Sequence, residues 1–180
     1  MKKIIKSHGS LVLVAGIVIL FDQVTKALVR MNLNFGESWS PFKGFASFIR
    51  IVHWENYGAA FGMFQNGGIV FGVLAAIVTL VIGFYYSRIP REFVIMRIAL
   101  AMQVGGALGN LIDRIRFGPV TDFIAVGTFP VFNVADSSIT IGVGILLLFI
   151  WLQERKEKAR LNQSAQTQQD TSDTPVNNQL

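Results

Sequence analysis

Four aspartates lie within or at the ends of long apolar stretches of the sequence, where an ionisable side chain is unexpected. They are Asp22, Asp113, Asp122 and Asp136. A charged group in the interior of a bilayer is costly, so by default it marks either a function or a buried partner. The chemistry open to each acid therefore depends on which basic or polar residues lie near it.

Two of these acids have candidate partners close in the sequence. Asp22 and Lys26 are four positions apart, so on a helix they share a face and can neutralise each other. Asp113 is followed by Arg114 and preceded three positions earlier by Asn110. We interpret the first pair as a structural ion pair, and the segment GNLIDR as a polar shell that supports a site.

Asp122 and Asp136 have no basic residue within four positions in the sequence. Two carboxylates that share a site cannot both ionise cheaply, so one tends to keep a proton while the other acts as a base. Such a pair can activate a water molecule for amide hydrolysis without a metal or a cofactor. We therefore predict that this pair is catalytic and that the protein needs neither a metal nor a cofactor.

A structural role is also open to Asp136. Asn133 followed by Asp136 resembles a helix N-cap with an acidic residue at the third helical position. The two interpretations are compatible, because a helix N-terminus favours the charged carboxylate. Capping would thus bias Asp136 toward the role of the base.

The elements that must position these residues are apolar. The sequence is 52% hydrophobic and 15% charged, which is outside the usual balance of a soluble domain. Four stretches approach the roughly 20 residues needed to cross a bilayer. They run from Ser10 to Val29, Gly67 to Tyr86, Phe93 to Ile112 and Ala135 to Leu152.

We predict an all-α membrane protein with four transmembrane helices and a small extracytoplasmic region that contains β structure. The membrane domain covers residues 1–160, with an outer loop at about 30–66 in which FASFIRIVHW alternates like a short strand. Residues 161–180 are polar and lack aromatic side chains, so we expect a disordered cytoplasmic tail.

The distribution of basic residues predicts the orientation. Ten of the sixteen lie before the first stretch, between the second and third stretches or near the start of the third, or after the fourth; five lie on the opposite side, and Lys26 lies inside the first stretch. By the positive-inside rule both termini are cytoplasmic, and Asp122 and Asp136 lie near the outer face. This charge pattern also argues against a nucleic-acid partner, which would favour one basic face.

Other features have simpler interpretations. The spacing of Gly105 and Gly109 is typical of close helix packing. His53 has no second histidine at ligand spacing, and the chain has no cysteine. Ser137 or Ser138 with Lys26 as a base is a weaker possibility, because no serine hydrolase motif surrounds them. The first stretch also has the basic start and apolar run of a secretory signal peptide, but no small-residue cleavage site follows it.

Two noncatalytic alternatives stay open. Buried acids also mark proton or ion pathways, although such acids would be spread through the depth of the membrane. The acids and arginines could instead only hold the helices together in an assembly factor.

Five motifs together resemble the lipoprotein signal peptidases, the bacterial signal peptidase II family of intramembrane aspartyl peptidases. The motifs cover about residues 10–152 in the order of the family, and they are FDQVTK, NYGAAFG, GGALGNLIDR, VTDF and FNVADSSITIG. The family has serine frequently where this chain has Gly62, and this chain has a polar C-terminal extension.

The resemblance implies that Asp122 and Asp136 are the catalytic dyad. It implies further that the supporting polar residues are Asn56, Asn110, Arg114, Asn133, Asp22, Lys26 and Asp113. The expected substrates are bacterial prolipoproteins carrying a diacylglyceryl group, cleaved just before the lipidated cysteine in the cytoplasmic (inner) membrane. Membrane lipid is a further expected partner, and globomycin-type cyclic peptides are expected inhibitors.

Overall fold

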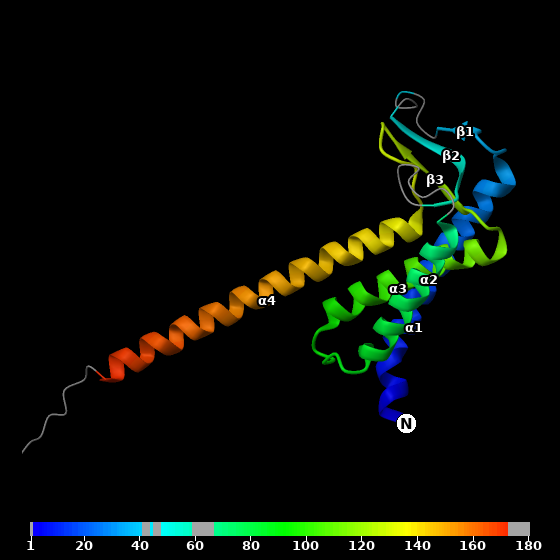
Figure 1. The fold of residues 1–180 in the computed structure, drawn as a ribbon. Helices are drawn as coiled ribbons and strands as arrows, with labels where there is room; N and C mark the ends of the chain where they lie inside the picture. The colour runs from blue at the N-terminus through cyan, green and yellow to red at the C-terminus, as the bar shows by residue number, and fades with distance from the viewer. Residues whose placement is uncertain (1, 41–43, 45–47, 59–66, 173–180) are drawn as a thin grey trace, which may run out of the picture.

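The computed structural model describes residues 2–40, 44, 48–58 and 67–172. Figure 1 shows the elements, which follow one another as α1 (Lys2–Asn32), β1 (Ser38–Trp39), β2 (Ile49–Asn56), α2 (Gly68–Tyr86), α3 (Val94–Arg116), β3 (Val120–Val126) and α4 (Val134–Ser172). Residues 59–62 of the NYGAAFG motif and residues 173–180 of the predicted tail lie outside the described residues.

Among the described residues, four helices are long and apolar enough to cross a membrane, at residues 8–32, 68–86, 94–116 and 134–164. These ranges contain the four predicted stretches almost entirely, which confirms the number and order of the spans. The helices extend a few residues further than predicted because polar residues such as Asn32 and Arg116 continue the helical backbone into the interface.

The helix α3 is the centre of the bundle and packs against each of the other three helices. Small residues permit this close approach. A Cβ atom at Gly105 would lie 2.7 Å from the Cβ atom of Val18 on α1, and one at Gly109 would lie 2.6 Å from Oδ2 of Asp22. The prediction that this glycine pair packs helices together is confirmed, and Gly109 also makes room for a buried carboxylate.

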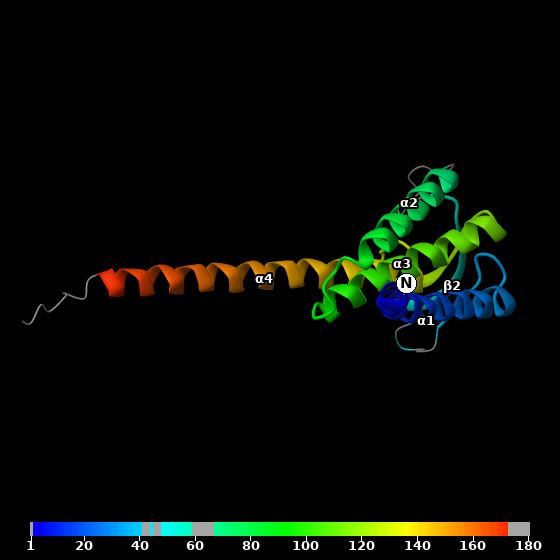
Figure 2. The same ribbon diagram turned by 90° about the horizontal axis from the view of Figure 1, so that it is seen from below.

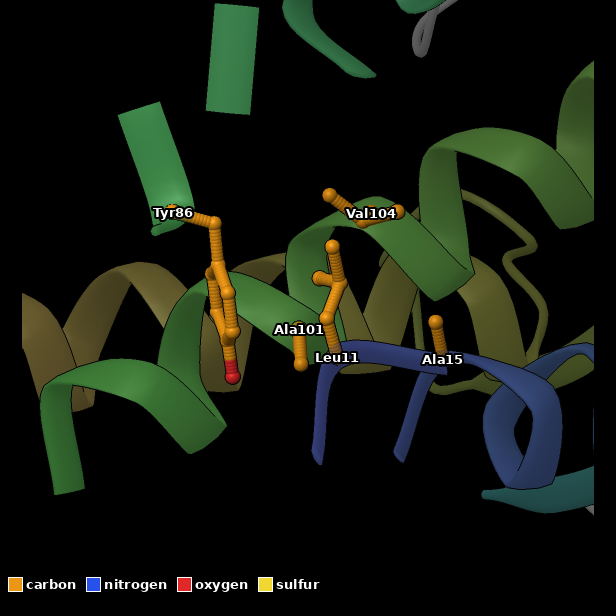
Figure 3. Packing of buried hydrophobic residues seen from close by; sticks show 5 residues of the cluster. All are labelled: Leu11, Ala15, Tyr86, Ala101 and Val104. Carbon is orange, nitrogen blue, oxygen red and sulfur yellow. The ribbon is translucent and has the colours of Figure 1, made fainter. Parts of the chain in front are cut away.

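An apolar cluster joins α1, α2 and α3 at the end of the bundle far from the sheet. It is centred on buried side chains shown in Figure 3, namely Leu11, Ala15, Tyr86, Ala101 and Val104. Tyr86 is fully buried although it is the last residue of α2. The cluster therefore holds the end of α2 against α1 and α3.

A three-stranded antiparallel sheet, in the order β1-β2-β3, covers the other end of the bundle (Figure 1). The strand β2 begins within the segment FASFIRIVHW, where the sequence predicted a short strand, and ends two residues after it. The strand β3 was not predicted from the sequence, and it connects α3 to α4. Gly118 and Gly127 have positive φ angles on either side of β3. They let the chain turn into and out of the strand.

The helix α4 extends far beyond the apolar stretch that ends at Leu152, and its C-terminal part lies apart from the other helices (Figures 1 and 2). Residues 161–172, which the sequence assigns to a disordered tail, are helical in the structure. The segment from Gln153 to Ser172 contains neither glycine nor proline and is rich in good helix formers such as Glu, Lys, Arg, Ala and Gln. The helix can therefore continue through this polar segment, although the segment has no apolar face.

Candidate active site

Asp122 lies in the middle of β3 and is held by the neighbouring strand. Residue 122 pairs with Trp54 of β2, and Asn56, two positions further along β2, donates from Nδ2 to Oδ2 of Asp122 at 2.9 Å. The side chain of Asp122 is 1% exposed. The sheet thus places this acid at the end of the bundle and supplies it with one donor.

Asp136 lies in the first turn of α4 and forms the predicted capping box. Its backbone N–H donates to Oδ1 of Asn133 at 2.9 Å, and the backbone N–H of Asn133 donates to Oδ2 of Asp136 at 3.2 Å. This reciprocal pattern fixes the start of the helix and the direction of the carboxylate. Asn110 donates from Nδ2 to the other oxygen of Asp136 at 2.7 Å.

Two buried amides connect the acids. Asn133 donates from Nδ2 to Oδ1 of Asp122 at 2.6 Å and to Oδ1 of Asn110 at 3.1 Å. Since Asn110 donates in turn to Asp136, a chain of hydrogen bonds runs from one acid to the other. The structure therefore brings together the two acids that the sequence left without partners.

Behind these amides lies a buried charge network centred on Lys26. Its Nζ lies 2.8 Å from Oδ2 of Asp22 and 3.1 Å from Oδ2 of Asp113, and all three side chains are fully buried. Nζ also donates to Oδ1 of Asn110 at 2.8 Å. The predicted pair between Asp22 and Lys26 is confirmed, but it is part of a larger network.

The same network holds the backbone beside each candidate catalytic acid. Oδ1 of Asp22 accepts from the backbone N–H of Ala135 at 3.0 Å, next to Asp136. Oδ2 of Asp113 accepts from the backbone N–H of Thr121 at 3.0 Å, next to Asp122. The spans α1 and α3 thus set the positions of β3 and α4.

Arg114, the candidate partner of Asp113 in the sequence, forms no ion pair with it among the described residues. Adjacent residues on a helix point about 100° apart, so Asp113 faces α1 while Arg114 faces elsewhere. The basic partners of Asp113 are Lys26 and, at 3.9 Å, Arg30.

Sequence reasoning also missed three polar residues of this region, which are Gln23, Arg30 and Thr121. Gln23 donates from Nε2 to Oδ2 of Asp22 and to Oδ1 of Asp113, each at 3.1 Å. Arg30 donates to Oγ1 of Thr121 at 2.8 Å. The sequence could have indicated Gln23 and Arg30, because they lie one and eight positions after Asp22 on the same predicted helix.

A cavity of about 580 Å³ opens at the two acids. Asp122 and Asp136 line it together with Asn56, Asn110 and Arg114, while the opposite wall is largely apolar and includes residues 129–132 and Ile141. Arg114 also lines two neighbouring cavities, and its buried Nε has no hydrogen-bond partner among the described residues. The five polar residues can therefore contact a ligand. Asp22, Lys26 and Asp113 do not line this cavity, and they support its residues through ion pairs and hydrogen bonds.

The electrostatics of the cavity favour one proton on the acid pair. Burial, together with the negative charge of Asp136, raises the pKa of Asp122 to about 7, although the donors Asn56 and Asn133 oppose this shift. An acid with such a pKa can hold a proton at neutral pH, while Asp136 accepts donors suited to a carboxylate.

The serines near the site have other roles. The hydroxyl of Ser137 donates to the carbonyl of Asn133, and that of Ser138 donates to the carbonyl of Met102, each at 2.9 Å. Lys26 is fully engaged by its two acids and Asn110. This arrangement does not favour a serine nucleophile with Lys26 as its base.

Replacing Lys26 by methionine is expected to destabilise the protein by about 3–5 kcal/mol, because two buried carboxylates lose their common counter-ion. The measurement is reversible unfolding in mixed micelles with increasing denaturing detergent. Lys158→Met, at an exposed position on α4, is the matched control and should change little. Equal stability of the two variants would contradict a supporting role for Lys26.

Comparison with known proteins finds one matching family and several similar proteins. The family model described as signal peptidase (SPase) II matches residues 14–152. The lipoprotein signal peptidase of Halothermothrix orenii is 40% identical, over 77% of this chain and 93% of its own. That of Moorella thermoacetica is 42% identical over 74% and 87%, and that of Staphylococcus aureus strain JH9 is 35% identical over 83% and 92%.

A solved structure of a bacterial membrane enzyme is also similar, with a TM-score of 0.74 and 34% identity over 83% of this chain and 92% of that one. The family match covers all the polar residues of the candidate site, from Asp22 to Asp136. The chain therefore belongs to the signal peptidase II family of membrane peptidases.

Proposed function

We propose that the protein is an intramembrane aspartyl endopeptidase that removes the signal peptide from diacylglyceryl-modified prolipoproteins, cleaving just before the lipidated cysteine. The observation that supports this function most directly is the pair Asp122 and Asp136, which line one cavity and are joined through Asn133 and Asn110. The relatives described as lipoprotein signal peptidases support the choice of substrate.

In the proposed mechanism Asp136 is the base and Asp122 is the acid. Asp136 takes a proton from a water molecule, which attacks the scissile carbonyl carbon, while Asp122 donates its proton toward the carbonyl oxygen. The tetrahedral intermediate then collapses: the C–N bond breaks, the proton on Asp136 passes to the leaving amine, and a hydroxyl proton of the intermediate returns to Asp122. General acid-base catalysis of this kind contributes roughly 10² to 10⁴ in rate.

Arg114 supports this mechanism from the wall of the cavity, where its positive charge can stabilise the developing oxyanion. A second cavity, of about 630 Å³, shares Arg114 and is lined by residues of α2 and α3 such as Ile69 and Ile115, which are exposed on the outside of the bundle. A lateral opening of this kind suits a substrate that stays anchored in lipid while its scissile bond reaches the acids.

The proposal includes the location of the protein. We place it in the bacterial inner membrane with both termini in the cytoplasm and the acids near the extracytoplasmic face. The excess of basic residues at the ends of the bundle far from the sheet supports this orientation. All four buried aspartates gather near the sheet, which argues against an ion pathway through the depth of the membrane.

Cleavage of a defined substrate tests the function. The purified protein in detergent micelles is incubated with a synthetic prolipoprotein peptide that carries, or lacks, the diacylglyceryl group, and mass spectrometry identifies the new N-terminus. We expect cleavage before the modified cysteine and inhibition by a globomycin-type cyclic peptide. Failure to cleave the lipidated peptide, under conditions where a relative cleaves it, would refute the proposal.

The rate of cleavage is expected to fall as the pH rises above about 7. The active pair holds one proton, and the raised pKa of Asp122 means that this proton is kept below about pH 7 and lost above it. The measurement is kcat with the lipidated peptide from about pH 5 to pH 9. Circular dichroism over the same range is the control for unfolding, and a kcat that keeps rising through the alkaline range would contradict the assignment.

A further inference from the structure

A separate cavity lies at the end of the bundle opposite the acids. It has a volume of about 230 Å³ and is lined by Ser10 of α1, by Arg91 in the loop before α3, and by Val94, Arg97 and Ile98 at the start of α3. Arg97 precedes Arg114 by 17 residues on α3. At 1.5 Å per residue this is about 26 Å, close to the thickness of the hydrocarbon core. The cavity is therefore at the depth of the other layer of lipid headgroups.

We propose that this cavity binds the phosphate group of an anionic phospholipid. Two guanidinium groups line it, and none of the described residues in its wall is acidic. The first turn of α3 also contains no acidic residue, and its N-cap residue Phe93 makes no side-chain capping bond. Arginine pairs and helix N-termini both favour phosphate oxygens.

Arg97 is held in place before any lipid binds. It is 6% exposed, its NH1 donates to the carbonyls of Tyr86 at 3.3 Å and Ile89 at 3.1 Å, and its NH2 donates to Oγ of Ser10 at 3.3 Å. The guanidinium also lies 4.2 Å from the centre of the Tyr86 ring. The two carbonyls, the hydroxyl and the ring together fix the orientation of the guanidinium.

Tyr86, one of the residues that orient Arg97, is itself held in a fixed position. Tyr86 is fully buried beside Ala101 and Leu11 (Figure 3). Its hydroxyl lies 3.0 Å from Oγ of Ser10 and donates to the carbonyl of Arg97 at 3.3 Å. A ligand at this position therefore meets donors that need little rearrangement, which reduces the entropic cost of binding.

The wall of the cavity favours a lipid over dissolved phosphate. Val94 is 55% exposed and Ile98 is 39% exposed, and both lie on a span whose outer surface faces hydrocarbon. An acyl chain can cover these side chains while the phosphate contacts the arginines. Basic pockets between transmembrane helices recognise anionic lipid headgroups in this way.

Native mass spectrometry of the full chain tests the proposal. The protein in neutral detergent is titrated with phosphatidylglycerol or with phosphatidylcholine, and bound lipid is counted. We expect preferential binding of phosphatidylglycerol, and about a fivefold loss of affinity in Arg91→Gln, which corresponds to about 1 kcal/mol per basic residue. Arg97→Lys keeps the charge but loses the planar fork, so it should also weaken binding.

The matched control is Arg88→Gln. Arg88 belongs to the same loop as Arg91, but it does not line the cavity and instead contacts the rings of Phe84 and Tyr85. Equal losses in Arg88→Gln and Arg91→Gln would overturn the proposal, because they would indicate surface charge alone. Equal binding of the two lipids, or displacement of phosphatidylglycerol by millimolar inorganic phosphate, would overturn it as well. Since Arg91 is exposed, its variant keeps the test valid even if Arg97→Lys fails to fold.

Discussion

Replacing Asp122 or Asp136 by asparagine is expected to reduce cleavage of a lipidated prolipoprotein peptide by at least about a thousandfold. The two acids are joined through the amides of Asn133 and Asn110, and in the proposed mechanism they act as one unit that holds a single proton, so either replacement removes both the base and the acid function. Asparagine has nearly the same shape as aspartate, so the bundle should still insert and fold. The measurement is kcat/KM in micelles, with each variant first checked for an unchanged unfolding midpoint.

The matched control for this pair is Ser137→Ala. Ser137 lines the same cavity as the acids, but its hydroxyl donates to the carbonyl of Asn133 in its own helix. Its loss should leave cleavage within a fewfold of the parent. Normal cleavage by the Asp122→Asn or Asp136→Asn variant would eliminate the dyad, and abolished cleavage in Ser137→Ala alone would revive a serine mechanism.

The sequence was sufficient to predict the spans and the acid pair for a common physical reason. Long apolar runs specify helices in a bilayer because the backbone must satisfy its own hydrogen bonds there. Against that background an aspartate without a basic neighbour is conspicuous. Asp122 and Asp136 could therefore be identified from their surroundings in the sequence alone, and the structure places both in one cavity.

The strand β3 could not be predicted because its pattern gives no alternation. Five of its seven residues, Val120 to Phe123 and Ala125, are buried, so apolar and polar positions do not alternate along VTDFIAV. Its pairing with β2 joins segments about 70 residues apart, as Trp54 and Asp122 show. Only the tertiary fold reveals that this segment positions a carboxylate.

The partners of the buried charges were harder to predict than the charges themselves. Lys26 was assigned to Asp22 from spacing, yet it also neutralises Asp113 and donates to Asn110 on another span. Proximity in sequence is a poor guide inside a bundle, because residues on facing helices are as close as those one turn apart. The network thus required the packing of α1 against α3, which small residues such as Gly105 and Gly109 permit.

Asn133 has two separable tasks, and substitutions can distinguish them. Its side-chain oxygen accepts from the backbone N–H of Asp136 and so caps α4, while its Nδ2 donates to Asp122. Serine at this position can still cap the helix but cannot donate to Asp122 in the same geometry, whereas alanine can do neither. Asn133→Ala should therefore lose about 1 kcal/mol of stability that Asn133→Ser retains.

Both variants are expected to lose roughly a hundredfold in kcat, a typical effect of removing one preorganised donor from an active site. Because the donor from Asn133 favours the charged form of Asp122, its removal raises the pKa of Asp122 further above its ordinary range. The proton is then kept to higher pH, so the alkaline decline in kcat should move upward from about pH 7 in both variants. If Asn133 had a purely structural role, its replacement would lower the stability of the protein without moving the alkaline decline in kcat. An unchanged pH profile in Asn133→Ser, with activity near that of the parent, would show that Asn133 only caps the helix.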